Sequence, residues 1–101
     1  MLLVALLTVE RSRLDAFRRY ETRAARIMAA HGGRIERALV MDGGLATLRE
    51  MHVVRFADDA AFASYRADPA LAALEAERDA CIATTEVWSA VDGPDYLPPS
   101  F

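Results

Sequence analysis

The segment EMHVVRF, residues Glu50–Phe56, combines the strongest strand pattern of the chain with three ionisable side chains. Successive side chains on a strand point to opposite faces, so Glu50, His52, Val54 and Phe56 share one face and the three residues between them share the other. Both faces are mostly apolar, which is typical of a central strand that is covered on both sides. The sequence therefore predicts a histidine and a carboxylate in the interior of the protein.

Length and composition fit one globular domain over residues 1–101, of which 53% are hydrophobic and 27% are charged. A net charge of -3 at pH 7 argues against nucleic acid and anionic membranes as partners. The single Cys81 cannot form an internal disulfide, so we expect a cytoplasmic protein. The apolar run Leu2–Val9 is too short to span a membrane and lacks a basic segment before it, so it is interpreted as a strand and not as a signal peptide.

A helical pattern follows this first strand. Apolar residues recur at helical spacing from Leu14 to Met28, with Tyr20 on the same stripe and Ser12 as the expected N-cap. Two glycines after His31 end the helix. A cation is favoured at a helix C-terminus by the helix dipole, so we expect His31 to have a capping role.

Strand and helix patterns continue to the end of the chain. The elements predicted there are a strand at Arg34–Val40, a turn at Asp42–Gly44, the Glu50–Phe56 strand, a helical segment, a strand at Ile82–Ser89 and an irregular tail at about 92–101. Asp58 or Asp59 is expected to cap the helical segment, and Asp68 with Pro69 to restart it as a second piece.

The order β-α-β-β-α-β predicts an α+β, ferredoxin-like domain with a four-stranded antiparallel sheet and two helices on one face. Two helices cover only one face of such a sheet. The first strand, Leu2–Val9, nevertheless offers apolar side chains to both faces. We therefore expect a homodimer in which the open sheet face packs against a second copy.

Five stretches carry a family resemblance: Phe17–Tyr20 (FRRY), His31–Gly33 (HGG), Glu50–Phe56, Phe62–Pro69 (FASYRADP) and Leu74–Arg78. In these the chain resembles the dimeric α+β-barrel superfamily, most closely the domain of unknown function 1330 family and more distantly the antibiotic-biosynthesis monooxygenases. The resemblance implies two sheets facing each other across a dimer, with a small-molecule cleft between helices and sheet in each protomer. It also implies that Glu50, His52 and Val54 point toward the helices, Arg55 toward the dimer side, and that Phe56 lines the cleft.

Glu50 and His52 are the candidate catalytic residues. They lie two residues apart on one strand face, where a small bend lets the carboxylate orient the imidazole. A neutral histidine near pH 7 is a suitable general base. The alternative interpretation is that Glu50 is solvated at the strand entry and that His52 is a hydrogen-bonded packing residue.

Arg78 continues the apolar stripe of Leu71 and Leu74, so its charge needs a partner. It is expected either to anchor an anionic substrate or to bridge to a carboxylate such as Glu50 or Glu86. A structural salt bridge and a substrate anchor both remain open at this point.

Aromatic side chains are the other candidate ligand contacts. Tyr20 and Tyr65 lie on the core stripes of their helices and either line a pocket or pack as plain core residues. Trp88 is expected to share a strand face with Ile82, and either to touch a ligand or to pack at the dimer seam.

No spacing of His, Cys or Asp indicates a metal site, and no glycine-rich phosphate loop is present. The sequence predicts a cofactor-free enzyme that performs isomerisation, cyclisation or dehydration on a small aromatic or polyketide-like molecule in bacterial secondary metabolism. His52 would move the proton, Glu50 would orient it and Arg78 would hold an anionic oxygen.

Two alternatives are a cofactor-free monooxygenase and a non-catalytic ligand-binding or structural dimer. Related haem-degrading enzymes, and several quinone-forming monooxygenases, use an asparagine. This chain contains none, which weakens the oxygenase interpretation.

Overall fold

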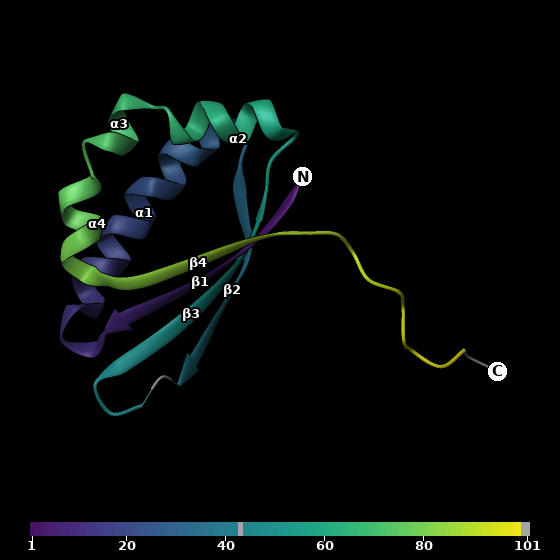
Figure 1. Cartoon of the computed structure of the whole chain (residues 1–101), viewed down its shortest axis with the longest axis horizontal. Helices are drawn as coiled ribbons and strands as arrows, with labels where there is room; N and C mark the ends of the chain where they lie inside the picture. Colours follow the sequence, from purple (N-terminus) through teal and green to yellow (C-terminus); the bar gives the residue numbers. More distant parts are fainter. Residues whose placement is uncertain (43, 100–101) are drawn as a thin grey trace.

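The computed structural model describes residues 1–42 and 44–99, and its strands form one antiparallel sheet in the order β2-β3-β1-β4 (Figure 1). The strands are β1 (Leu2–Glu10), β2 (Arg34–Asp42), β3 (Thr47–Arg55) and β4 (Ile82–Ala90). The helices are η1 (Arg11–Arg13), α1 (Leu14–Ala30), α2 (Asp59–Arg66), α3 (Pro69–Ala72) and α4 (Glu75–Cys81). The helices lie together on one face of the sheet (Figure 1), which confirms the predicted ferredoxin-like α+β fold.

The start of α1 differs from the prediction. Arg11–Arg13 form a 3-10 turn, and α1 begins at Leu14 without a side-chain hydrogen bond at its N-cap. The expected cap by Ser12 is therefore wrong, because this residue lies inside the 3-10 turn. The turn is held instead by Arg11, which donates a 2.8 Å hydrogen bond to Asp42 at the end of β2. The predicted turn at Asp42–Gly44 includes Gly43, which lies outside the described residues.

The caps of the second helical segment follow the prediction. Asp58 accepts a 2.8 Å hydrogen bond from the backbone N–H of Ala61 at the start of α2. Asp68 accepts an equally short one from Ala70, with Pro69 in the first turn of α3. The segment divides into three short helices where two were expected, and these three lie on the same face of the sheet as α1 (Figure 1).

The centre of the covered sheet face is occupied by small or polar side chains. On β1, Leu3, Ala5 and Leu7 face the helices in turn, and Ala5 pairs with His52 of β3 and Val87 of β4. Hydrophobic clusters lie on both sides of this central row. One contains Leu7, Val9, Phe17, Tyr20, Ala24, Cys81 and Ile82, and the other contains Leu3, Met28, Val54, Phe56 and Tyr65. The fold therefore has two small apolar cores with a gap between them.

A β-bulge changes the facing of β4. Thr8 pairs with Thr84 but Val9 pairs with Ile82, so one residue of β4 is extra. Ile82 consequently turns into the core, where it is 7% exposed, while Trp88 lies on the opposite face and is 48% exposed. The expectation that Trp88 and Ile82 share a face is wrong, because simple alternation does not reveal a bulge.

The sheet face opposite the helices has an apolar centre flanked by charged residues such as Arg37 and Glu86, and no other part of the described residues covers it. Cross-strand pairing places Val4, Val53 and Trp88 in one row of this face, and Leu6 and Met51 in the next. Residues 91–99 have no regular secondary structure and run away from the sheet (Figure 1). No helix in residues 1–42 and 44–99 is long and apolar enough to cross a membrane.

The two glycines after α1 are required for different reasons. Gly32 has a φ of 73°, the left-handed region that glycine adopts without strain, and the space around its missing Cβ is open. Gly33 packs directly on the ring of Phe56, so that a Cβ there would overlap the ring and the Met28 side chain. Because of this close approach, the chain after α1 can pack directly against Phe56, the residue that follows β3.

Substituting these glycines separates backbone strain from overpacking. Gly33→Ala is expected to destabilise the protein by about 1 to 3 kcal/mol, because the added methyl group displaces Phe56 in the core. Gly32→Ala is expected to cost about 1 to 2 kcal/mol through backbone strain alone. Urea unfolding measures both losses, and NMR should show shifted Phe56 ring signals only in Gly33→Ala. A Gly33→Ala protein with wild-type stability and unshifted ring signals would contradict the packing.

Candidate functional site

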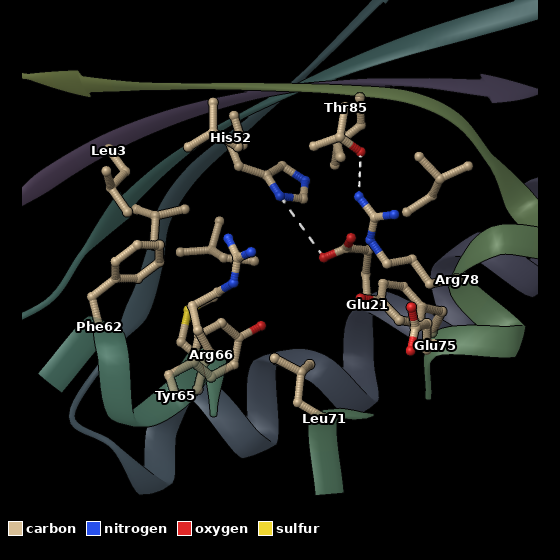
Figure 2. Close-up of a pocket in the computed structure, with 18 of the residues that line it drawn as sticks. Leu3, Glu21, His52, Phe62, Tyr65, Arg66, Leu71, Glu75, Arg78 and Thr85 are labelled. Carbon is tan, nitrogen blue, oxygen red and sulfur yellow. Dashed lines mark hydrogen bonds and ion pairs between the residues drawn. The ribbon is translucent and has the colours of Figure 1, made fainter. Parts of the chain in front are cut away.

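A pocket of about 500 Å³ occupies the gap between the two apolar cores, with the sheet as its floor and residues of α1, α2, α3 and α4 along its other walls (Figure 2). Its volume lies within the range of small-molecule sites. Ala5, at the middle of the floor, is the small side chain that leaves this space open. His52 of β3 pairs with Ala5 of β1 and points into the pocket from the sheet (Figure 2).

His52 and Glu50 form the buried polar pair that the strand pattern predicted. Both face the helices, are 4% and 6% exposed, and are joined by a 2.8 Å hydrogen bond from Nε2 of His52 to Oε2 of Glu50. Glu50 lies behind His52 and does not line the pocket. Its other carboxylate oxygen is 3.8 Å from the guanidinium of Arg18 on α1. The expectation that Glu50 is solvated at the strand entry is therefore wrong.

The hydrogen bond with Glu50 decides which nitrogen of His52 is available for chemistry. An ionised carboxylate can only accept hydrogen bonds, so Nε2 of His52 carries a proton when Glu50 is ionised. In the neutral imidazole the lone pair is then on Nδ1. Nδ1 lies 3.8 Å from Oε2 of Glu21, a residue that lines the pocket (Figure 2). The arrangement thus presents a free imidazole nitrogen on the pocket side.

Glu21 of α1 is the site residue that sequence reasoning missed. Its carboxyl has a raised pKa, chiefly because burial disfavours the charged form and secondarily because Glu50 lies nearby, while His52 and Arg78 oppose the shift. A signal for it was present in the sequence. Glu21 interrupts the helical series Leu14, Phe17, Ala24 and Met28 at a position where an apolar residue is expected.

Arg78 lies on the opposite side of the imidazole from the apolar end of the pocket (Figure 2). It donates a 2.5 Å hydrogen bond to the hydroxyl of Thr85 on β4 and has a weaker contact of 3.7 Å with Asp79. Neither of the carboxylates expected from the sequence, Glu50 and Glu86, is its partner within the described residues. The guanidinium lines the pocket near Tyr20 and Glu21, and its charge opposes the rise in the pKa of both groups.

Aromatic rings form the apolar end of the pocket. The ring of Phe56 contacts Phe62 edge-on at 5.3 Å between centroids and Tyr65 at 5.5 Å. Burial raises the pKa of Tyr65 to about 12 and also raises the pKa of Tyr20 near Arg78. Both phenols therefore stay protonated at neutral pH and can donate hydrogen bonds. Of the residues predicted to contact ligand, Tyr20, Tyr65, Phe56 and Arg78 line the pocket.

Two other candidate residues lie away from this pocket. Trp88 is on the opposite sheet face and does not contribute to the lining. His31 is the C-cap residue of α1, and its Nε2 is 2.8 Å from the carboxylate of Asp68, which holds the end of α1 against the cap of α3. This pairing lowers the pKa of Asp68, mainly through the hydrogen bond with His31.

The pocket's chemical groups suit proton transfer. Residues 1–42 and 44–99 contain no cluster of three or more His, Cys, Asp or Glu side chains that could hold a metal ion. They do bring together a histidine whose Nε2 is hydrogen-bonded to Glu50, a carboxyl with a raised pKa and an arginine that can stabilise a negative oxygen. This set can remove a proton at one point of a bound molecule and return one at another.

Comparison with known proteins shows the fold. The sequence matches no protein-family model, and no curated protein is significantly similar to it. Among solved structures, a candidate antibiotic biosynthesis monooxygenase from Bacteroides thetaiotaomicron is similar over 99% of this chain and 95% of its own, with a TM-score of 0.70 and 16% identity. A NIPSNAP domain protein of uncharacterised role from Burkholderia xenovorans is similar over 99% of this chain and 100% of its own, with a TM-score of 0.67 and 17% identity.

SnoaB, a cofactor-independent oxygenase from Streptomyces nogalater, is also similar, over 91% of this chain and 94% of its own. Its TM-score is 0.63 and its identity 15%. The chain therefore has the ferredoxin-like α+β fold of the antibiotic biosynthesis monooxygenases. At these identities the likeness concerns the fold, and the chemistry has to be argued from the site itself.

The raised pKa of Glu21 makes a pH-dependent prediction for stability. Because its folded pKa lies above its ordinary value of 4.5, its stabilising contribution is complete at low pH and is lost as the pH rises through the folded pKa. Glu21→Gln, which mimics the neutral carboxyl, should therefore be more stable than the wild type at pH 7, and the difference should vanish below about pH 4. Thermal unfolding across this pH range measures the effect.

Glu75→Gln is the matched control, since Glu75 is a solvent-exposed carboxyl at the rim of the same pocket. Its pH profile is expected to follow that of the wild type. A Glu21→Gln profile that also parallels the wild type would show that Glu21 is not desolvated as the structure indicates.

Proposed function

We propose that this protein is a cofactor-free enzyme that catalyses proton transfer on a small aromatic or polyketide-like molecule, as an isomerase, cyclase or dehydratase. The observation that carries the proposal is the line of three groups Glu50, His52 and Glu21. Two distances define it, 2.8 Å from Glu50 to Nε2 and 3.8 Å from Nδ1 to Glu21. A buried imidazole held on one side by a carboxylate and open to a pocket on the other suits a general base.

In the proposed reaction, Nδ1 of His52 takes a proton from an acidic C–H or O–H group of the substrate. The imidazolium that forms is stabilised by the carboxylate of Glu50, which acts as a positioning residue. The electron pair left on the substrate becomes an enolate, and the guanidinium of Arg78 stabilises its oxygen. Returning the proton to another carbon gives isomerisation, while protonation of a leaving hydroxyl by Glu21 gives dehydration.

The shape of the pocket supports a ring-containing substrate. Its apolar end presents the edges and faces of Phe56, Phe62 and Tyr65, which suit a flat ring. Its polar end presents His52, Glu21 and the Arg78–Thr85 pair. A molecule with one apolar ring and one oxygen-bearing edge satisfies both ends.

We also propose that the protein is related to the domain of unknown function 1330 family and that it is cytoplasmic. The family relationship is supported by the fold and by the five sequence stretches that carry the resemblance. The rival activity, that of a cofactor-free oxygenase, would consume oxygen in step with substrate, and uptake in an oxygen electrode separates it from proton transfer. A non-catalytic binding protein would show neither.

We also propose that the protein is a homodimer joined through the open sheet face. This face presents Val4, Met51, Val53 and Trp88, and no described segment of the same chain covers it. Trp88 is 48% exposed there, which is unusual for a large aromatic side chain on a strand. A second copy of the same face would bury these residues against their equivalents.

Proton transfer can be tested before the substrate is known. The probes are three ring ketones with acidic C–H groups: 2-tetralone, anthrone and 1,3-indandione. In deuterated water the wild type is expected to accelerate exchange of the acidic proton of at least one probe, measured by proton NMR. His52→Gln should lower that rate by about 100-fold to 10,000-fold, because the base is lost.

His31→Gln is the control, since His31 is the only other histidine and lies outside the pocket lining. It should retain the wild-type rate. The proposal fails if no probe exchanges faster with the protein, or if His31→Gln and His52→Gln lower the rate equally.

The dimer is tested by sedimentation equilibrium. The wild type should show twice the 11.1 kDa mass of one chain. Val53→Glu places a charge at the middle of the open face and is expected to give monomers, because an unpaired charge is costly to bury. Ala29→Glu, on an exposed position of α1, should leave the dimer intact. A wild-type mass of one chain at all concentrations would contradict the dimer.

A further inference from the structure

Arg66 is a second arginine that lines the pocket, and the proposed reaction does not use it. It is the last residue of α2, and its guanidinium carbon lies 5.8 Å from the centroid of the Phe62 ring. Among residues 1–42 and 44–99, no carboxylate forms an ion pair with it. The charge of Arg66 thus lies at the aromatic end of the pocket without a counter-ion among these residues.

The two arginines approach the pocket from different walls. Figure 2 shows the Arg66 guanidinium entering from α2 and that of Arg78 from α4, with His52 on the sheet between them. Arg78 is held by its 2.5 Å hydrogen bond to the hydroxyl of Thr85, and the carboxylate of Asp79 lies 3.7 Å away. Two permanent cations therefore face one small volume.

Three acidic residues, Glu21, Glu75 and Asp79, share the pocket lining with the two arginines. Glu75 and Asp79 lie on the solvent-exposed side of α4, and the contact of Asp79 with Arg78 is 3.7 Å. Glu21 points inward, and burial raises its pKa, which favours its neutral form. An anion entering the pocket would meet fixed positive charge and a carboxyl able to accept a proton.

We propose that the substrate class of this pocket is an organic anion: a ring carboxylate whose charged group lies between Arg66 and Arg78 while the ring packs on Phe62 and Phe56. Guanidinium groups bind carboxylates through paired hydrogen bonds, and two of them would fix the ligand in one orientation. This inference rests on the proposed function for its biological meaning. It can nevertheless be tested by binding alone.

The experiment compares two matched pairs of probes, benzoate with benzamide and 2-naphthoate with 2-naphthamide, by isothermal titration calorimetry at low ionic strength. Each amide has nearly the shape of its acid but no charge. At least one carboxylate should bind tenfold or more tightly than its amide, and added sodium chloride should weaken only the carboxylate. Arg66→Gln and Arg78→Gln should each reduce carboxylate affinity about tenfold and leave amide affinity unchanged.

Arg26→Gln removes an equal charge from an exposed position of α1 outside the pocket, and should leave both affinities unchanged. Equal binding of acid and amide in both pairs, or no binding by either acid, overturns the proposal. A loss in Arg66→Gln no greater than in Arg26→Gln also overturns it. Since Arg66 is on the surface at the end of a helix, its variant should fold even if that of Arg78 does not.

The binding result is independent of proton transfer. His52→Gln should keep the preference for carboxylate over amide, because the base does not hold the charged group. If that preference is present while no probe undergoes exchange, the anion site stands and the catalytic proposal fails. If exchange depends on His52 but acid and amide bind equally, the catalytic proposal stands and the anion site fails.

Discussion

The buried hydrogen bond between His52 and Glu50 is the constraint on which the rest of the structure depends. An imidazole and a carboxylate that are each less than a tenth exposed are stable in a protein interior only when each satisfies the other. Their position at the centre of the sheet prevents the helices from closing over it with apolar side chains alone. The chain accommodates this by dividing its core into two clusters and placing the small Ala5 between them.

The pocket follows from that division. Each core has its own large aromatic anchor, Phe17 in one and Phe56 in the other, and both are almost completely buried. The middle of the covered face has no such anchor, and long polar side chains from the surrounding helices reach it, among them Glu21 from α1 and Arg78 from α4. The polarity of the pocket is therefore a consequence of where the two cores end.

Local patterns in the sequence were sufficient to predict the helices and strands and to predict which residues of the central strand face the helices. Period-two alternation placed Glu50 and His52 together, and the Asp68–Pro69 pair marked a helix start, because both signals depend on neighbouring residues alone. The partner of His52 could not be predicted in the same way. Glu21 reaches it only through the path of α1 across the sheet, and the bulge that turns Ile82 inward depends on pairing with β1. Contacts between distant elements are set by packing, which a single periodicity does not contain.

Alternation on β3 also connects the two faces of the sheet. Glu50, His52 and Val54 point to the pocket side, while Met51 and Val53 point to the open apolar face. A slip of one residue in the pairing of β3 would exchange these two sets, moving Glu50 and His52 to the open face and Met51 and Val53 toward the helices. Apolar contacts on the open face therefore oppose the same slip that would remove His52 from the pocket. In a dimer that buries this face, contacts between the two copies would oppose a change in the register of β3. The position of the His52 imidazole and the stability of the interface would then both depend on this one strand.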